Sequence, residues 1–325
     1  MRKSRKWLLI LPVLVLAIVV IAVLLPKAPV LETVRWASLN DWAPDGAISR
    51  VGDRWYFSSG TYGRVYDPDF GSGWNQDVIG PSNVPEAFDQ NYAAPGSVLQ
   101  INGKWFMFYH GESHECAGHF PFHAGIGLAT SEDGYFWTRQ GQILSTWEER
   151  PTCQENRASG VGYPSAVQHD GYIYLYFVSW TSAEADATHV ARCEAEHILE
   201  SDCWKKYFQG DWMEPGLGGH STPVLSRSSE AELYLAAPQV QISEGTFLGV
   251  FETNLGFVTA TSQDGIVWSQ PKTIFEFPKP HIEATGQDWY SYPTLIREDG
   301  QWWLYMARQD SSLVHHMHRI AVTLP

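Results

Sequence analysis

Three acidic residues stand where they could take part in acid–base chemistry. Asp45 precedes a short apolar run, Glu112 follows an aromatic run, and Glu214 lies in a glycine-rich segment. Hydrolysis by general acid–base catalysis needs one carboxylic acid to protonate the leaving group and one carboxylate to activate water. The acid also needs a raised pKa, which burial or a neighbouring carboxylate supplies. We therefore take these three residues as candidate catalytic groups, with loop capping or pairing to a nearby Arg or His as the alternative.

Aromatic and polar side chains in the same loops are candidates for binding a substrate. Aromatic rings can stack on sugar rings, and arginine and histidine side chains can hydrogen-bond to hydroxyl groups. The candidates are Trp212, Trp289 and Tyr290 for stacking, and His110, Arg157, His220 and Arg308 for hydrogen bonding. Arginines of this kind can instead hold carboxylates in place.

A histidine-rich run raises a metal site as another possibility. His110, His114, His119 and His123 recur at spacings that metal ligands can adopt. Against this, the run is expected to form a loop rather than a helix, and Cys116 within it is expected to be oxidised. We predict no metal or other cofactor, and we interpret these histidines as hydrogen-bonding groups that line a polar pocket.

A phrase repeated five times predicts the elements that position these residues. An apolar run, a turn and an aromatic-rich run begin near Gly46, Gly96, Tyr163, Thr222 and Tyr292. Asn-Gly or Asp-Gly occupies the turn in three copies and supplies the positive φ that a β-hairpin needs. Because one hairpin cannot bury its own apolar face, the copies must stack into a common core. We therefore predict an all-β protein, a five-bladed β-propeller.

A second repeat supports this assignment of blades. Residues 129–137 and 260–268 share the pattern Ala-Thr-Ser-x-Asp-Gly-x-x-Trp, at the same place after the hairpin in blades two and four. We interpret the pattern as the end of a third strand, a turn, and a tryptophan that packs between blades. Residues 32–37 are expected to add an outer strand to the last blade, so that no edge stays open. One domain, residues 28–325, is expected to hold the whole propeller.

The loop lengths predict which face of the propeller carries the function. Loops that enter a blade and loops that follow its second strand share one face. Here they are long, covering residues 60–95, 110–123, 140–162, 209–221 and 277–291. Loops of this length in a compact domain are usually functional, whereas the opposite face is served by tight turns. We expect Asp45 and at least one of Glu112 and Glu214 to meet at the axis on the long-loop face.

The sequence resembles the five-bladed glycosidases of glycoside hydrolase family 43, the arabinanase and β-xylosidase type. The resemblance rests on the hairpin phrase, on the Ala-Thr-Ser-x-Asp-Gly-x-x-Trp pattern, and on blade-entry words such as Ala94-Pro95. It implies that an Asp opening blade one is the general base, that an Asp opening blade three tunes the pKa, and that a Glu opening blade four is the general acid.

These family positions match this sequence only in part. Asp45 fits the base, but Tyr163-Pro164 stands where the family has Asp-Pro. Blade four is expected to open at Ser221-Thr222-Pro223, which has no acid, so that Glu214 or Glu112 would have to substitute. The sequence therefore predicts either a rewired site or a propeller without one.

The N-terminus predicts a membrane anchor. Four basic residues within the first six are followed by an uncharged apolar run of nineteen residues, 7–25. As a helix this run would be about 28 Å long, close to the thickness of a bilayer's hydrocarbon core. The residues after it form a poor cleavage site, so we favour an uncleaved anchor over residues 1–27, with a cleaved signal peptide as the alternative. The basic end places the propeller outside the cytoplasm, in the periplasm or outside the cell.

Cysteine content and charge limit the compartment and the partners. The four cysteines suit an oxidising compartment. Of the three possible connectivities we prefer Cys193–Cys203 with Cys116–Cys153. A net charge of −14 argues against nucleic acid and against polyanionic glycans as ligands.

Together these features predict a glycoside hydrolase that acts on a neutral glycan. A non-catalytic propeller that binds a glycan or assists envelope assembly is the alternative, favoured by the missing acids of blades three and four. A propeller that binds proteins is a third class. The sequence names neither the sugar nor the stereochemical outcome.

Overall fold

Strands make up most of this computed structural model. It describes residues 30–34, 48–60, 62–70, 75–114, 116, 120–181, 187–227, 234–281, 283–284, 288–309 and 315–325. Within these residues the helical elements are two short 3-10 turns, Pro68–Phe70 and Ala195–His197. The protein is therefore all-β in the part of the chain that the structure describes.

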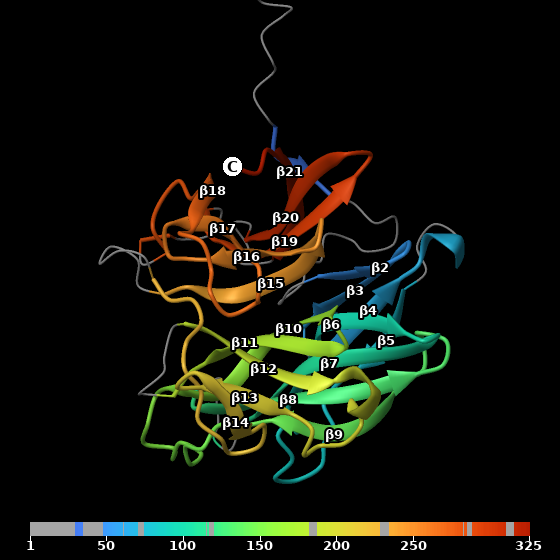
Figure 1. Ribbon diagram of the computed structural model, residues 1–325, viewed down its shortest axis with the longest axis vertical. Helices are drawn as coiled ribbons and strands as arrows, with labels where there is room; N and C mark the ends of the chain where they lie inside the picture. The colour runs from blue at the N-terminus through green and yellow to red at the C-terminus, as the bar shows by residue number, and fades with distance from the viewer. Residues whose placement is uncertain are drawn as a thin grey trace, which may run out of the picture.

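Five groups of antiparallel strands surround a common centre and form the blades of a propeller (Figure 1). Blade one holds β2 (Ser49–Val51), β3 (Arg54–Ser59), β4 (Tyr62–Tyr66) and β5 (Asn75–Ile79). Blade two holds β6 (Tyr92–Ile101), β7 (Lys104–Ser113), β8 (Phe122–Ser131) and β9 (Thr138–Leu144). Blade three holds β10 (Ala158–His169), β11 (Tyr172–Ser179), β12 (Thr188–Glu194), β13 (Lys205–Phe208) and an extra outer strand, β14 (Asp211–Pro215). Blade four holds β15 (Ala236–Ser243), β16 (Thr246–Glu252), β17 (Gly256–Ser262) and β18 (Lys272–Glu276), and blade five holds β19 (Tyr290–Glu298), β20 (Gln301–Gln309), β21 (His315–Val322) and β1 (Glu32–Thr33).

Neighbouring blades are held together by apolar clusters, one at each junction. Trp204 lies in the cluster between blades two and three, Phe251 between three and four, and Met107 between one and two. Leu304 lies between blades four and five, and Phe57 between five and one. Each blade therefore buries its apolar faces only against its neighbours, which is why the sequence repeats a unit that cannot fold alone.

Type I′-like turns join the first two strands of four blades. In Asn102-Gly103, Asp170-Gly171 and Asp299-Gly300 both residues have positive φ, as the sequence predicted for these three hairpins. Glu244-Gly245 makes the corresponding turn of blade four, between β15 and β16.

The prediction for blade four was wrong. Its hairpin was expected between Thr222 and Leu235, but the inner strand begins at Ala236. Thr222 instead donates its N–H to the carbonyl of Tyr207, and Val224 to that of Thr188, so this segment lies along the outer strands of blade three. Thr222-Pro223 resembles the X-Pro pairs at which other blades begin, and this similarity led to the wrong prediction. The hairpin turn Glu244-Gly245 was not predicted.

The second repeat forms a hydrogen-bonded turn, as expected. Asp133 Oδ1 accepts the N–H groups of Tyr135 and Phe136, and Asp264 does the same for the two residues two and three positions beyond it. Trp137 and Trp268 then pack against the clusters between blades.

The N-terminal strand β1 closes the ring by pairing with the last blade. Glu32 and Thr33 of β1 pair with β21, which confirms part of the closing strand predicted for residues 32–37; residues 35–37 lie outside the described residues.

The predicted disulfides Cys116–Cys153 and Cys193–Cys203 are both present. None of the helices in the described part of the chain is long and apolar enough to cross a membrane, and the expected anchor, residues 1–27, lies outside that part.

Candidate functional site

Irregular strand pairing marks the axis on the face where the inner strands begin. In blades three to five the pairing of the first two strands shifts at an X-Pro pair, and in blade two it shifts at Gly96, directly after Ala94-Pro95. Tyr163, Ala237 and Tyr292, each just before its proline, have positive φ. Such bulges turn a side chain away from its regular direction. Here the rings of Tyr163 and Tyr292 meet with centroids 5.8 Å apart, although they belong to blades three and five. The two rings therefore lie near the propeller axis, on the face where the inner strands begin.

Glu112 lies on this face, near the end of β7, and is clamped by two histidines. Nε2 of His110 is 2.8 Å from Oε1 of Glu112, and Nε2 of His114 is 2.7 Å from Oε2. Burial opposes ionisation of Glu112, but these hydrogen bonds outweigh it and lower its pKa to about 2. Glu112 is thus a permanent carboxylate, and it is unsuited to donate a proton.

His110 links the carboxylate of Glu112 to the ring of Tyr163. Its ring stacks on Tyr163 with centroids 5.6 Å apart and planes 13° apart. The described histidines of the predicted polar pocket therefore make hydrogen bonds: His110 and His114 to Glu112, and His123 Nδ1 to the hydroxyl of Ser159 at 2.8 Å. His119 lies outside the described residues.

Glu214 does not lie at the axis. It was expected in a loop that enters blade four, but it belongs to β14, the outermost strand of blade three, where it pairs with Lys206 of β13. Its Oε2 accepts the N–H of His220 at 2.9 Å. The glycine-rich segment therefore closes a turn at the outer edge of the sheet, four strands away from the inner strand β10.

Asp45, the expected base, lies outside the described residues. The description resumes at Ile48, which is buried between blades one and five, directly before β2. The role of Asp45 stays a prediction.

Glu252, at the end of β16, is a carboxyl group beside the inner strand β19 that the sequence analysis missed. It pairs across the ladder with Ala236, and its Oε2 accepts the N–H of Tyr292 at 2.9 Å. Burial raises the pKa of Glu252 to about 7, against the opposing effects of hydrogen bonds from the Tyr292 N–H and the Tyr234 hydroxyl to the carboxylate. Glu252 is therefore a carboxyl group that can carry a proton near neutral pH.

A signal for Glu252 was present in the sequence. Ala237-Pro238 repeats the blade-entry word Ala94-Pro95, and Glu252 ends an aromatic run, as Glu112 does in blade two. The misplaced hairpin of blade four hid this correspondence. The position that opens blade four holds Ala236, and Glu252 approaches the same place from the neighbouring strand.

Three of the expected substrate-binding residues cluster beside Glu252. Trp289 stacks on His281 with centroids 4.3 Å apart, and the carbonyl of Tyr290 lies 2.6 Å from Nε2 of the same histidine. Arg308 pairs with Tyr290 in the ladder and lies over its ring at 5.4 Å. Because Tyr290 is buried, it supports the site rather than offering a stacking surface.

The other expected binding residues have partners away from Glu252. Arg157 forms ion pairs with Glu148 and Glu155, at 3.0 and 3.1 Å. Trp212 lies beneath Arg192, in the apolar cluster between blades three and four. His220 stacks on Phe208 beside Trp147. None of these contacts brings the three residues to the axis.

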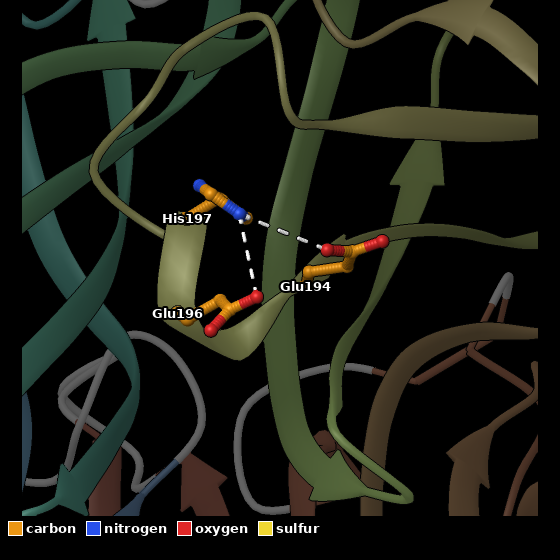
Figure 2. Close-up of side chains that lie close together, drawn as sticks. All are labelled: Glu194, Glu196 and His197. Carbon is orange, nitrogen blue, oxygen red and sulfur yellow. Dashed lines mark ion pairs between the residues drawn. The ribbon is translucent and has the colours of Figure 1, made fainter.

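A small cluster of possible metal ligands lies in the turn after β12 (Figure 2). Nε2 of His197 lies 3.8 Å from Glu194 and 3.4 Å from Glu196. Nδ1 of His197 also contacts Glu200 at 2.8 Å. Both glutamates drawn are exposed, and ion pairs with His197 account for the arrangement.

Comparisons with known proteins show a shared fold and no close relative. No protein-family model matches the sequence, and no curated protein matches it. An exo-1,5-α-L-arabinanase from a bovine ruminal metagenomic library is 15% identical with a TM-score of 0.56, covering 88% of this chain and 94% of its own. An α-L-arabinofuranosidase from Lactobacillus brevis is 11% identical with a TM-score of 0.57, covering 89% and 94%. A family 43 endo-arabinanase from Bacillus licheniformis is 12% identical with a TM-score of 0.52, covering 90% and 98%. This chain therefore shares nearly its full length of fold with five-bladed glycosidases, as the resemblance implied.

Proposed function

We propose that this protein is a glycoside hydrolase in which Glu252 is the proton donor and Asp45 the base. The observation that carries the proposal is the environment of Glu252, a carboxyl group that is buried beside the inner strand β19 and whose pKa is raised to about 7. A general acid works best when its pKa lies near the working pH. The shared fold of known glycosidases supports this assignment.

The proposed reaction divides the work between the two carboxyl groups. Glu252 gives its proton to the leaving oxygen, and the carboxylate of Asp45 activates the attacking water. Their separation would set the stereochemistry, with about 6.5–9.5 Å giving inversion and about 5–5.5 Å retention. Glu112 does not exchange a proton in this scheme. Its carboxylate holds His110 against Tyr163, near the axis where a neutral glycan would enter.

Screening aryl glycosides and plant or microbial oligosaccharides tests the proposal. We expect Glu252→Gln and Asp45→Asn each to lower kcat/KM by about 10²–10⁴-fold, the usual contribution of general acid–base catalysis. Glu214→Gln is the matched control, because the carboxyl group of Glu214 lies at the outer edge of blade three. The kcat/KM of this variant should equal that of the wild type. Full activity in Glu252→Gln would remove Glu252 from the mechanism.

A glycan-binding propeller without catalysis is the second candidate. Tyr163 favours it, because an aromatic ring stands where the resemblance implies an aspartate, and it meets Tyr292 across the axis. Saturable glycan binding that Tyr163→Ala abolishes, with no hydrolysis by the wild type, would support this alternative.

We also propose that residues 28–325 form the propeller domain and that residues 1–27 anchor it outside the cytoplasm. The two disulfides support an oxidising compartment. The intact mass of protein isolated from its membrane tests the anchor, since a mature chain beginning near Ala28 would show a cleaved signal instead.

A further inference from the structure

A chain of hydrogen bonds joins Glu252 to the loop after β18. The hydroxyl of Tyr234 lies 3.3 Å from Oε1 of Glu252 and makes a short hydrogen bond with Nδ1 of His281. Nε2 of His281 lies 2.6 Å from the carbonyl oxygen of Tyr290. The chain thus joins the segment before β15, the end of β16, the loop after β18 and the start of β19.

The far end of this chain sets the direction of every hydrogen bond in it. A carbonyl oxygen can only accept, so the proton of neutral His281 sits on Nε2 and leaves the Nδ1 lone pair as an acceptor. Tyr234 therefore donates its proton to Nδ1. Toward Glu252 the hydroxyl oxygen of Tyr234 can then only accept, which requires the proton to be on Oε1 of Glu252. Oε2 matches this, because it accepts the N–H of Tyr292 as the carbonyl oxygen of a protonated carboxyl group does. When Glu252 is ionised, the same hydroxyl would instead donate to Oε1 and lower the pKa of Glu252, so the two states predict opposite effects of removing it.

The surroundings of His281 keep it in the neutral form that this direction requires. Its ring lies between Phe277 and Trp289, with centroids 4.5 and 4.3 Å away and planes 15° and 6° apart. Burial lowers the pKa of His281 to about 4. The charged groups nearby, Arg308 and Asp288, act on the ring of Tyr290, and Asp288 is itself paired with Lys279 at 2.6 Å.

We propose that Tyr234 and His281 are positioning residues that hold the proton on Glu252. A carboxylate neighbour favours the protonated acid by charge repulsion. Tyr234 and His281 favour the protonated acid in another way. Because Tyr234 donates its proton to His281, its hydroxyl oxygen is left to accept a hydrogen bond from protonated Glu252. That this proton serves glycoside hydrolysis rests on the proposed function. The chain of hydrogen bonds from Glu252 through Tyr234 to His281, here called the relay, does not rest on it.

Titration of the Glu252 carboxyl carbon by NMR tests the relay without any substrate. The resonance is assigned by its loss in Glu252→Gln. Tyr234→Phe removes the acceptor and should lower the pKa of Glu252 by about one unit, because a hydrogen bond and one pKa unit are of similar size. Tyr176→Phe is the matched control. Its buried hydroxyl donates to the carbonyl of Gly265 at 2.9 Å, and its loss should leave the titration unchanged.

The sign of the shift decides between the two directions of hydrogen bonding. If Tyr234 donated to Glu252, its removal would raise the pKa of Glu252, and either a rise or no change would overturn the proposal. His281→Phe keeps a ring between Phe277 and Trp289 but frees the Tyr234 proton for Glu252, so it should also lower that pKa. With an active enzyme, Tyr234→Phe should move the alkaline limb of the kcat/KM profile down by the same unit, about tenfold at pH 8. If no glycoside is cleaved, the proposed function fails, and the NMR titration still decides the relay.

Discussion

Two glutamates at like positions in blades two and four take opposite protonation states because of what surrounds them. Glu112 and Glu252 both lie near the end of a second strand on the same face. Two imidazole N–H groups hold Glu112 as a carboxylate, while burial favours protonated Glu252. Between about pH 2 and pH 7 the face therefore carries one fixed anion and one neutral acid.

The raised pKa of Glu252 predicts a stability that falls with pH. Folding raises this pKa from its ordinary 4.5 to about 7, so the folded state holds the proton more tightly than the unfolded state. The stabilisation is complete below pH 4.5 and is lost as the pH rises through 7, at up to about 1.4 kcal/mol per pH unit. Urea unfolding between pH 4.5 and 8 should show this decline in wild type but not in Glu252→Gln. Parallel curves for the two proteins would contradict the raised pKa.

Glu252 also shows what a residue's local sequence cannot reveal. Its pKa depends on burial and on hydrogen bonds with Tyr292, which is 40 positions away, and with Tyr234, in the segment before β15. Neither contact has a signature within the strand that carries Glu252. Glu112 lies near the end of a second strand, where its position in the repeat predicts it, but its hydrogen bonds with His110 and His114 were predicted only as part of a polar pocket.

At the scale of elements, local turn chemistry made most of the blades predictable. Asn-Gly and Asp-Gly pairs need no distant contact to specify a hairpin, and all three formed. Blade four failed because Thr222-Pro223 resembles a blade entry while Glu244-Gly245 is a less familiar turn. The same error displaced Glu214 and concealed Glu252, since both assignments depended on where that blade begins.

The disulfide Cys116–Cys153 is predicted to support the clamp on Glu112. It ties the segment after His114 to the segment that precedes β10, across 37 residues. Replacing both cysteines by serine should cost about 3–4 kcal/mol of unfolding free energy and raise the pKa of Glu112 as His114 loosens. Denaturant unfolding and carboxyl NMR measure the two effects. The matched control replaces Cys193 and Cys203, which are 10 residues apart, and should cost about 1 kcal/mol less and leave Glu112 unchanged. An unaltered pKa in the first variant would show that His114 is held without the disulfide.

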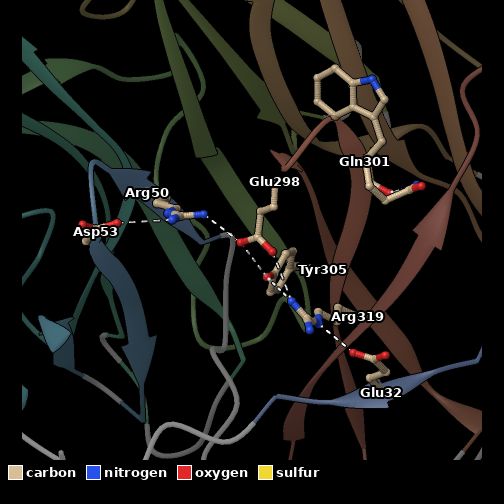
Figure 3. A network of polar contacts seen from close by, with 8 residues as sticks. Glu32, Arg50, Asp53, Glu298, Gln301, Tyr305 and Arg319 are labelled. Atoms are coloured by element: carbon tan, nitrogen blue, oxygen red, sulfur yellow. Dashed lines mark hydrogen bonds and ion pairs between the residues drawn. The ribbon is translucent and has the colours of Figure 1, made fainter.

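At the scale of the whole molecule, an ion-pair network closes the ring at the junction of blades five and one (Figure 3). In the described part of the chain, Glu32 and Thr33 of β1 pair with β21, and the N–H of Val34 donates to the carbonyl of Met317 at 2.9 Å. Arg319 of β21 reinforces this pairing, with Nε 2.9 Å from Glu32 and NH1 3.1 Å from Glu298. Glu298 in turn accepts Arg50 of blade one at 2.7 Å. One arginine therefore links the N-terminal strand, the last blade and, through Glu298, the first blade.

Arg319→Met is predicted to weaken the whole propeller rather than one blade. Its guanidinium also lies 4.1 Å from the ring centre of Trp303, and the ion pairs are partly exposed, so we expect a loss of about 2 kcal/mol from the sum of modest terms. Arg297→Met is the matched control, because Arg297 also faces a tryptophan but makes a single exposed ion pair, 3.9 Å from Glu244, and it should cost less than about 0.5 kcal/mol. Urea unfolding at low salt and at about 1 M salt measures both, and the difference should shrink as salt screens the exposed charges. Because a ring opened at one junction exposes the faces of two blades, the transition should stay cooperative while its midpoint falls. Equal losses in the two variants would show that β1 and the apolar cluster between blades five and one close the ring without this network.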